Sequence, residues 1–475
     1  MNPCDVNTLA EKLEAIVGED AVIRAPEDLL TYECDAYIVH RSTPDLVVMP
    51  GSTEEVSRVM ALLNEVDVPV IPRGTGTSLA GGCLPVSGGV VVSTMRMTRI
   101  RKIDLRNRYA ELDAGCINAR LHEAINPHGY HYAPDPSSEQ SCTIGGTVGT
   151  NAGGPHTLQW GMTTNHVLGV EMVLPDGTVI HTGGPNCDNP GYDLTGLLVG
   201  SEGTLGIVTG VTVKLVRKAD ALRTMLVVFD HLEDATNTVT DIIGAGIVPA
   251  AMELMDQVIV GAVESGLHIG LPTDAEALLI IELDGPEAGL DDLVDQVVEW
   301  CQKNHVRDIK RANSDEERTA LWQGRKRSFG CIGKLSRSFV CEDGVVPRTH
   351  LSTVIREIGK IGEKYNIRIA NIAHAGDGSL HPILLYDERN PDEVRRMIQC
   401  SSETIQACLD LGGSVTGEHG IGWEKVKFLA KQFNEKDLES MRKIRDVFNP
   451  KGLCNPHKMM HSDVPLVKHF EEAVA

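Results

Sequence analysis

Apolar residues recur along this chain at two spacings, one typical of amphipathic helices and the other of buried strands. After Ser52, apolar side chains repeat at helical spacing as far as Val66, and Ser52 followed by Glu55 is typical of a helix-capping box. Helical spacing predicts further helices at residues 8–17, 27–33, 234–245, 289–303, 391–411 and 435–447. Short apolar runs predict strands at residues 68–71, 89–93, 109–114, 165–174, 206–216, 223–229 and 278–283.

The pattern of the chain changes near Lys218. Before this residue, glycine is dense from 145 to 210 and most predicted elements are strands; after it, strands alternate with long helices. Such alternation, together with hairpins, indicates a compact α+β domain. Because 475 residues exceed one ordinary domain, we expect two or three packed units.

Residues 370–386, ANIAHAGDGSLHPILLY, read as a hairpin of two apolar strands. Asp377-Gly378 suits a two-residue type I′ turn, which places His374 opposite His381 with Cβ atoms about 4.5–5.5 Å apart. The later run GEHGIG adds Glu418 and His419. Two imidazoles and a carboxylate predict a divalent metal site with positions open for a substrate. The alternative is a pair of half-buried strand histidines and a plain glycine turn.

Three glycine-rich segments expose main-chain N–H groups: residues 73–82, 142–154 and 200–208. Consecutive small residues can form a nest for phosphate oxygens. The first segment lacks the third glycine of a Rossmann fingerprint and the Lys-Ser/Thr of a P-loop. Taken singly, each segment is a turn cluster; taken together, they favour a large cofactor that lies against the main chain.

Composition excludes several classes of protein. Lys and Arg number 44 against 66 Asp and Glu, and a net charge of −22 disfavours nucleic acid and anionic membrane surfaces. Twelve cysteines occur without a CxxC pair, which argues against an iron–sulfur cluster or zinc ribbon in this chain and fits reduced thiols. We find no export signal and no apolar run near the about 20 residues of a membrane helix, so we expect a cytoplasmic protein that is not integral to a membrane.

Several motifs together resemble one known family. RGTGTSLAGG, YAPDPSSEQSCTIGGTVGTNAGG and GSEGTLGIVTGVTVKL are similar to the PCMH-type FAD-binding domain of the vanillyl-alcohol oxidase superfamily. NIAHAGDGSLHP, GEHGIG and NPKGLCNPHK resemble the branch that holds the glycolate oxidase flavoprotein subunit, D-lactate dehydrogenases and D-2-hydroxyglutarate dehydrogenase. The likeness runs in order from about residue 25 to 460.

The resemblance implies an α+β fold. It places an FAD-binding domain of two α+β subdomains at residues 1–218, with its core at about 40–218. A substrate- and metal-binding α+β domain with an antiparallel sheet would follow at 219–430. A helical segment at 431–475 would return to the FAD domain.

The resemblance also implies where FAD binds. The pyrophosphate would lie on the loop of Pro72, Arg73, Gly74, Thr75, Gly76, Thr77 and Ser78. The flavin ring and ribityl chain would be lined by Pro134, Ser138, Thr143, Gly145, Gly146, Asn151, Gly153, Gly203, Gly206, Ile207 and Val208. Asn455 would close over the flavin. The phosphate loop has no histidine or cysteine, so we expect non-covalent FAD.

In the same branch, His374, His381 and Glu418 match the ligands of a divalent metal, and His419 matches the catalytic base. The ligand set suits zinc, manganese or iron. Arg325 matches the arginine that holds the substrate carboxylate; without the resemblance it reads as a surface cation beside Lys326. These roles are what the resemblance implies.

The implied reaction is oxidation of a small 2-hydroxy acid, glycolate or D-lactate, to the 2-oxo acid, with hydride transfer to flavin N5. Residues 338–344, SFVCEDG, lack the additional cation of relatives that oxidise 2-hydroxyglutarate, which favours a monocarboxylate. The alternatives are a D-2-hydroxyglutarate dehydrogenase, a non-catalytic FAD-carrying subunit, and a metal-dependent hydrolase. Electrons would pass to an acceptor other than NAD, such as an iron–sulfur subunit or an electron-transfer flavoprotein, in an oligomer that is peripheral to a membrane through its partner.

Overall fold

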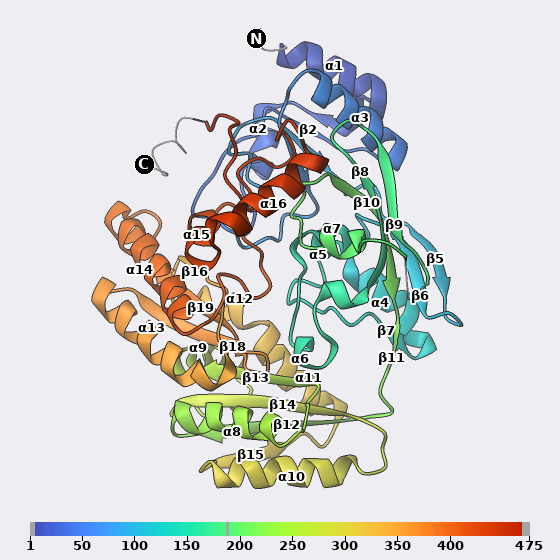
Figure 1. The fold of residues 1–475 in the computed structure, drawn as a ribbon. Coiled ribbons are helices and arrows are strands. Elements are labelled where there is room, and N and C mark those ends of the chain that lie inside the picture. Colours follow the sequence, from blue (N-terminus) through green and yellow to red (C-terminus); the bar gives the residue numbers. More distant parts are fainter. Residues whose placement is uncertain (1–4, 187–189, 468–475) are drawn as a thin grey trace. The chain divides into compact units, whose positions relative to one another are not determined.

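The computed structural model describes residues 5–186 and 190–467. The chain forms two compact units (Figure 1). The first unit takes the residues up to 152, residues 162–217 and the residues from 419 onwards; the second takes residues 153–161 and 218–418. Each unit mixes helices and strands, and the C-terminal residues return to the unit that holds the N-terminal ones, so the α+β prediction is confirmed. Whether the predicted boundaries at 218 and 430 delimit independently folding domains stays a prediction.

The first unit contains two main sheets. A four-stranded sheet has the order β1-β2-β4-β3, in which β2, β3 and β4 run parallel, and a five-stranded antiparallel sheet has the order β5-β6-β10-β8-β9. A short pair joins β7 to β11. The strands are β1 (Val22–Ile23), β2 (Leu46–Val48), β3 (Val70–Arg73), β4 (Val90–Ser93), β5 (Ile100–Asp104), β6 (Tyr109–Asp113), β7 (Tyr130–His131), β8 (Val167–Val173), β9 (Val179–Gly183), β10 (Ile207–Lys214) and β11 (Val216–Arg217).

Amphipathic helices cover these sheets with their apolar faces. Those of α1 and α3 share a core with the four-stranded sheet, and those of α4, α5 and α7 share a core with the five-stranded sheet. The helices of the unit are α1 (Val6–Val17), α2 (Pro26–Leu29), α3 (Thr53–Glu65), α4 (Asn118–Ile125), α5 (Ile144–Thr150), α7 (Leu194–Leu198), α15 (Leu429–Gln432) and α16 (Glu435–Phe448). The predicted capping box is half formed: Ser52 Oγ accepts from Glu55 N–H at 3.3 Å, but Glu55 Oε2 accepts from Gly51 N–H at 2.8 Å instead of Ser52.

The second unit is built on one sheet of eight strands. Its order is β15-β12-β14-β13-β18-β19-β16, with β17 also paired to β19, and every pair is antiparallel. The predicted antiparallel sheet is therefore confirmed. The strands are β12 (Ala221–Phe229), β13 (Ala251–Asp256), β14 (Ala277–Gly285), β15 (Asp308–Arg311), β16 (Ser338–Cys341), β17 (Gly344–Val345), β18 (Arg368–His374) and β19 (Ser379–Tyr386).

Both faces of this sheet are covered by helices. One apolar core joins a face to α8 (Leu232–Gly244), α10 (Leu290–Lys303) and α13 (Leu351–Tyr365). A second core joins the opposite face to α9 (Gln257–Leu267), α11 (Asp315–Lys326) and α12 (Ser328–Ile332). Helix α14 (Pro391–Asp410) packs beside α13, and the short α6 (Thr157–Trp160) contacts β13 (Figure 1). Within residues 5–186 and 190–467, each helix is too short or too polar to cross a bilayer.

The predicted register of the histidine hairpin is wrong. His374 lies opposite Ser379 and Ile372 lies opposite His381, around a four-residue turn at 375–378. The cause lies in the neighbouring strand, because Ala375 donates its N–H to Met252 O of β13 at 2.8 Å instead of pairing with β19. The shift amounts to two residues, so His374 and His381 remain on one face of the sheet as diagonal neighbours.

Candidate active site

The hairpin histidines and Glu418 converge in the second unit. His374 Nε2 and His381 Nε2 each lie 3.1 Å from Glu418 Oε1, and the centroids of the two imidazole rings are 5.0 Å apart. One donor atom from each of the three residues lies within 4.8 Å of the other two. Both histidine side chains are buried, at 4–5% exposure, and Glu418 is 11% exposed. The predicted ligand set is thus assembled in space, although its role as a metal site stays a prediction.

A buried aspartate fixes the loop that carries Glu418. Asp343 follows β16 and has no solvent exposure. Its carboxylate accepts the main-chain N–H groups of Gly417 at 2.9 Å and of Glu418 at 3.1 Å, and it accepts a hydrogen bond from the Thr416 hydroxyl. It also lies 3.8 Å from His381 Nδ1. These contacts hold the Glu418 carboxylate beside the hairpin by its backbone.

A second buried carboxylate, Glu253 of β13, connects His374 to Arg325. Glu253 Oε1 lies 2.7 Å from His374 Nδ1, and Glu253 Oε2 lies 2.7 Å from an Arg325 terminal nitrogen. Arg325 is only 1% exposed, so the reading of this residue as a surface cation is wrong. Its Nε is buried and has no hydrogen-bond partner among the described residues. A guanidinium edge therefore remains available to an anionic ligand.

The charges of these groups depend on one another. Burial raises the pKa of Glu253, but the Arg325 and His374 cations outweigh burial and lower it below its usual value. Burial likewise raises the pKa of Glu418, and the two imidazoles lower it well below its usual value. Burial lowers the pKa of His374, while Glu253 and Glu418 raise it well above its usual value. Two imidazoles that face one ionised carboxylate are a donor set that fits zinc, manganese or ferrous iron.

The glycine-rich segments meet in the first unit. A Cβ on Gly74 would lie 2.5 Å from Thr143 Oγ1, which caps α5 by accepting from Gly146 N–H at 3.1 Å. A Cβ on Gly203 would lie 2.7 Å from the Pro72 ring, and Gly203 has a φ of +71°. The loop after β3, the start of α5 and the loop before β10 are therefore in close contact; that they form one cofactor cradle stays a prediction.

The C-terminal segment closes the same region. Asn455 donates from Nδ2 to Gly82 O at 3.0 Å and to Glu202 O at 2.6 Å. The Glu202 carboxylate accepts the N–H groups of Ile421 at 2.6 Å and Gly422 at 2.7 Å. Burial raises the pKa of Glu202 to about 7, although these hydrogen bonds act to lower it. Thus 420–422 and 455 are both tied to the loop before β10.

Two hydroxyls of the predicted phosphate loop are suited to bind phosphate oxygens. Thr75 Oγ1 and Ser78 Oγ are buried and have no hydrogen-bond partner among the described residues. Buried hydroxyls normally have partners, and phosphate oxygens would supply them. Arg73 at the end of β3 is itself buried and donates to Cys34 O at 2.8 Å. The residues present in this loop therefore fit the FAD pyrophosphate.

The other predicted cofactor residues are located in or beside α5, β10 and the loop after β3. Pro134 and Ser138 belong to the turn before α5, where Pro134 O accepts from Asn118 Nδ2 at 2.9 Å. Gly145 and Gly146 lie in α5, Asn151 caps its C-terminal end with a φ of +53°, and Ile207 and Val208 begin β10. Gly206, with a φ of +156°, directly precedes β10, and Gly76 and Thr77 belong to the phosphate loop. Gly153 opens the segment 153–161 that packs with the second unit, and His419 directly follows Glu418 in the chain.

The sequence reading missed three carboxylates, two in the second unit and one in the first. Glu253 and Asp343 are buried carboxylates and Glu202 is a half-buried one, and the partners of all three come from distant parts of the chain. The signal at Glu253 is a lone acid inside the apolar strand AMELM. A charge in such a strand is stable only with a partner, so it could have been marked as a site residue. Asp343 and Glu202 lie in polar loops and carry no comparable signal.

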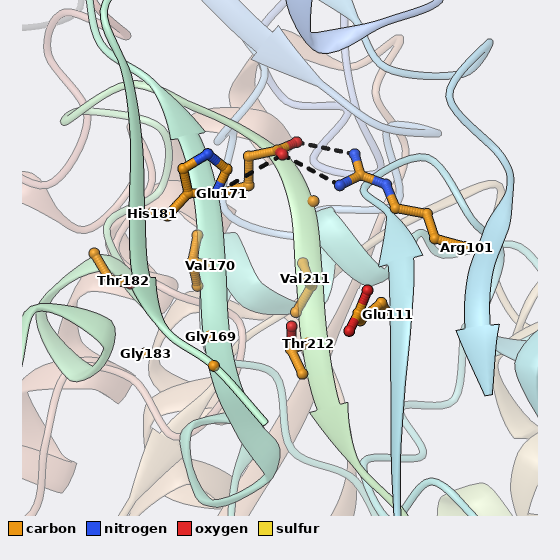
Figure 2. A pocket seen from close by; sticks show the side chains of 12 residues that line it. Arg101, Glu111, Gly169, Val170, Glu171, His181, Thr182, Gly183, Val211 and Thr212 are labelled. Atoms are coloured by element: carbon orange, nitrogen blue, oxygen red, sulfur yellow. Dashed lines mark hydrogen bonds and ion pairs between the residues drawn. The ribbon is translucent and has the colours of Figure 1, made fainter. Parts of the chain in front are cut away.

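A groove on the five-stranded sheet is a separate feature of the first unit. It has a volume of about 270 Å³ and is lined by residues of β5, β6, β8, β9 and β10, among them Arg101, Glu171 and His181 (Figure 2). Arg101 binds Glu171 at 2.9 Å. Burial raises the pKa of Glu171, but hydrogen bonds from Arg101, Thr53 and Thr209 lower it to about 2. None of the predicted site residues lines this groove.

Comparison with models of protein families shows which family this chain belongs to. Residues 44–183 match the FAD binding domain, and residues 218–459 match the C-terminal domain of FAD linked oxidases. The chain belongs to the FAD-linked oxidase family. This oxidase is therefore a flavoprotein oxidoreductase, and the family resemblance of its motifs is confirmed.

Several relatives share most of their length with this FAD-linked oxidase. The glycolate oxidase subunit GlcD of Escherichia coli K12 is 39% identical over 92% of this chain and 88% of its own. The subunit GlcD of Bacillus subtilis is 38% identical over 95% and 97% of the two chains. The D-lactate dehydrogenase of Archaeoglobus fulgidus is 34% identical over 87% and 91%.

Solved structures share the fold of this oxidase. Substrate-bound p-cresol methylhydroxylase has a TM-score of 0.81 at 16% identity and covers 96% of this chain and 97% of its own. The 4-ethylphenol oxidase of Gulosibacter chungangensis has a TM-score of 0.78 at 18% identity, with the same coverage of the two chains. These likenesses bear on the fold alone.

Gly74→Ala is expected to lower FAD occupancy. The new Cβ would lie within 2.5 Å of Thr143 Oγ1, so the loop must move or Thr143 must leave its capping position, at about 1 kcal/mol for the lost cap. The ratio of flavin to protein absorbance after purification measures occupancy. Gly244→Ala is the control, because a Cβ there meets open space. Equal flavin content in both variants would contradict the assigned cradle.

Proposed function

We propose that this FAD-linked oxidase oxidises a small 2-hydroxy monocarboxylic acid, glycolate or D-lactate, to the 2-oxo acid. One observation carries the proposal: Glu253 contacts both His374, a member of the predicted ligand set, and the buried Arg325. His374 and His381 in turn contact Glu418. A 2-hydroxy acid offers two matching groups, a hydroxyl and a carboxylate on adjacent atoms. The names of the relatives, glycolate oxidase subunit and D-lactate dehydrogenase, support the same substrate class.

Two groups supply chemistry that the side chains lack. FAD, bound non-covalently by the glycine-rich loops and Asn455, supplies the acceptor for the hydride from the substrate α-carbon. A divalent cation held by His374, His381 and Glu418 supplies Lewis acidity toward the substrate hydroxyl. The remaining tasks fall to residues of the chain.

Arg325 orients the substrate in this proposal. Its guanidinium binds the carboxylate through charge-assisted hydrogen bonds, for which Nε is a buried donor without a partner among the described residues. Burial at 1% exposure removes competition from water. Orientation matters because errors of about 1 Å at a reacting centre cost about 10²-fold in rate.

His419 is the general base in this proposal. It follows the ligand Glu418 directly in the chain, which places an imidazole next to the ligand set in sequence. A neutral imidazole has a lone pair that can accept the hydroxyl proton. His419 would take the hydroxyl proton, and the α-hydrogen would leave as hydride to the acceptor that FAD supplies, so the substrate would lose two electrons and two hydrogens.

The segment 338–344 favours a monocarboxylate. It contains the buried side chains of Cys341, Glu342 and Asp343. Residues 338–344 include no Lys or Arg. A second substrate carboxylate would need a cation where the chain provides acids. D-2-hydroxyglutarate is therefore the weaker alternative.

The acceptor of the electrons is a further part of the proposal. The twelve cysteines include no CxxC pair, which argues against an iron–sulfur cluster in this chain, so we infer that reduced flavin passes its electrons to an external acceptor. An iron–sulfur subunit or an electron-transfer flavoprotein fits this role and implies a heteromeric assembly. Such an assembly is expected in the cytoplasm, peripheral to a membrane through the partner.

Anaerobic mixing with glycolate, D-lactate, L-lactate and D-2-hydroxyglutarate tests the proposed function. We expect flavin bleaching with glycolate or D-lactate and none with D-2-hydroxyglutarate. Bleaching by none of these acids would support a non-catalytic FAD-carrying subunit. The retention of all four residues of the His/His/Glu/His set speaks against that alternative.

Removal of the metal is expected to separate flavin binding from flavin reduction. After treatment with EDTA and desalting, the oxidised flavin spectrum should persist, because the glycine-rich loops contain none of the three ligands. Bleaching by the preferred acid should be lost and should return with zinc, manganese or ferrous iron. Undiminished bleaching by protein shown by elemental analysis to be metal-free would contradict metal assistance.

A further inference from the structure

Glu253 is a buried acid in the middle of an apolar strand. It has no solvent exposure, and its neighbours Met252 and Leu254 are equally buried. A carboxylate in such a place is strongly destabilising unless both oxygens find partners. Both do, in different ways: Oε1 is hydrogen-bonded to His374 Nδ1 at 2.7 Å, and Oε2 forms an ion pair with an Arg325 terminal nitrogen at 2.7 Å that lacks hydrogen-bond geometry.

The contact to His374 determines which imidazole nitrogen can bind a cation. An ionised carboxylate can only accept, so His374 Nδ1 must carry the proton that Glu253 Oε1 receives. His374 Nε2 is then the nitrogen left to offer a lone pair. It points to Glu418, 3.1 Å away, and thus to the ligand set.

The contact to Arg325 determines which edge of the guanidinium remains for a ligand. One terminal nitrogen is taken by Glu253 Oε2, and Nε has no partner among the described residues. Rotation of the guanidinium would break the 2.7 Å contact inside a site closed to water. Glu253 therefore holds the Arg325 guanidinium in place by its charge and sets the tautomer of His374 by a hydrogen bond.

We propose that Glu253 is a positioning residue that couples the metal ligand His374 to the carboxylate clamp Arg325. This inference rests on the proposed function for the roles of these two neighbours. It predicts that one substitution weakens the binding of the cation and of the substrate carboxylate together. A merely structural ion pair would change stability and leave both affinities intact.

Glu253→Gln is the informative variant because it keeps the shape of the side chain. An amide has one accepting end and one donating end, so it can accept from His374 or from Arg325 but cannot accept from both. Glu282→Gln is the matched control. Glu282 is also buried on this face of the sheet and accepts from Trp322 Nε1 of the same helix α11 at 2.8 Å. Its other contacts are to Thr224, His156 and Arg318.

The test uses the full-length protein with FAD bound. Zinc affinity is measured by competition with a chromophoric chelator. Binding of oxamate, a carboxylate that the flavin cannot oxidise, is followed at saturating zinc through the flavin spectrum. For Glu253→Gln we expect a rise of about 10–100-fold in the zinc Kd and a clear rise in the oxamate Kd. Glu282→Gln should leave both constants unchanged.

Two results would overturn the proposal. One is unchanged zinc and oxamate binding in Glu253→Gln; the other is a loss of zinc affinity without any effect on oxamate, which would remove the coupling. If Glu253→Gln does not fold, Glu253→Asp keeps the charge and is expected to show the same joint loss, because it is too short to reach both partners. Wild-type protein that binds zinc but is bleached by no 2-hydroxy acid would contradict the proposed function, and the zinc and oxamate comparison would still decide the role of Glu253.

Discussion

Replacing His419 with alanine is expected to lower the rate of flavin reduction by substrate about 10²–10⁴-fold, the usual contribution of a positioned general base. The flavin should remain bound, because the FAD contacts implied for the chain come from other segments. The affinity for oxamate should change little, since Arg325 and the ligand set stay in place. Anaerobic stopped-flow measurement of flavin bleaching gives the rate constant directly.

The pH profile adds a second readout for His419. If its imidazole takes the hydroxyl proton, the dependence of the reduction rate on pH should differ between the wild type and the variant. His461→Ala is the control, since His461 is exposed and remote in sequence from the ligand set. A variant that is bleached as fast as the wild type, with the same pH profile, would contradict the assignment of His419 as the base.

The sequence predicted correctly that His374 and His381 lie on one face of the sheet, but it did not predict the register in which their strands pair. The hairpin was predicted with a two-residue turn, but Ala375 bonds to β13, and the turn takes four residues. Because side chains alternate along a strand, an error of two residues leaves the same face occupied. The convergence of His374 and His381 therefore survived a wrong register.

Other features depend on contacts that no local pattern encodes. Residues 144–150 form helix α5, although Gly145, Gly146 and Gly149 lower helix propensity by about 1 kcal/mol each. The Thr143 cap and packing against the five-stranded sheet stabilise it. Likewise, the Glu253 contacts join residues 121 positions apart in sequence, and only the assembled sheet brings them together.

Removal of the Arg325 charge is expected to damage both stability and substrate binding. Arg325→Met keeps the aliphatic stem but leaves Glu253 buried at 0% exposure without its guanidinium partner. Breaking a buried ion pair from one side costs about 3–5 kcal/mol. Loss of charge-assisted hydrogen bonds worth about 1.5–3 kcal/mol should raise KM roughly 10–100-fold. Thermal unfolding by circular dichroism and steady-state kinetics measure the two effects.

A double variant separates the two consequences. Arg325→Met combined with Glu253→Gln removes both charges, so no uncompensated carboxylate remains. The melting temperature of the double variant should therefore lie well above that of Arg325→Met and closer to that of the wild type. The raised KM should persist, because no cation remains to bind the substrate carboxylate. Recovery of KM together with stability would show that Arg325 acts only by neutralising Glu253. Arg325→Lys, which keeps a charge but not the planar fork, should fall between the wild type and Arg325→Met in KM.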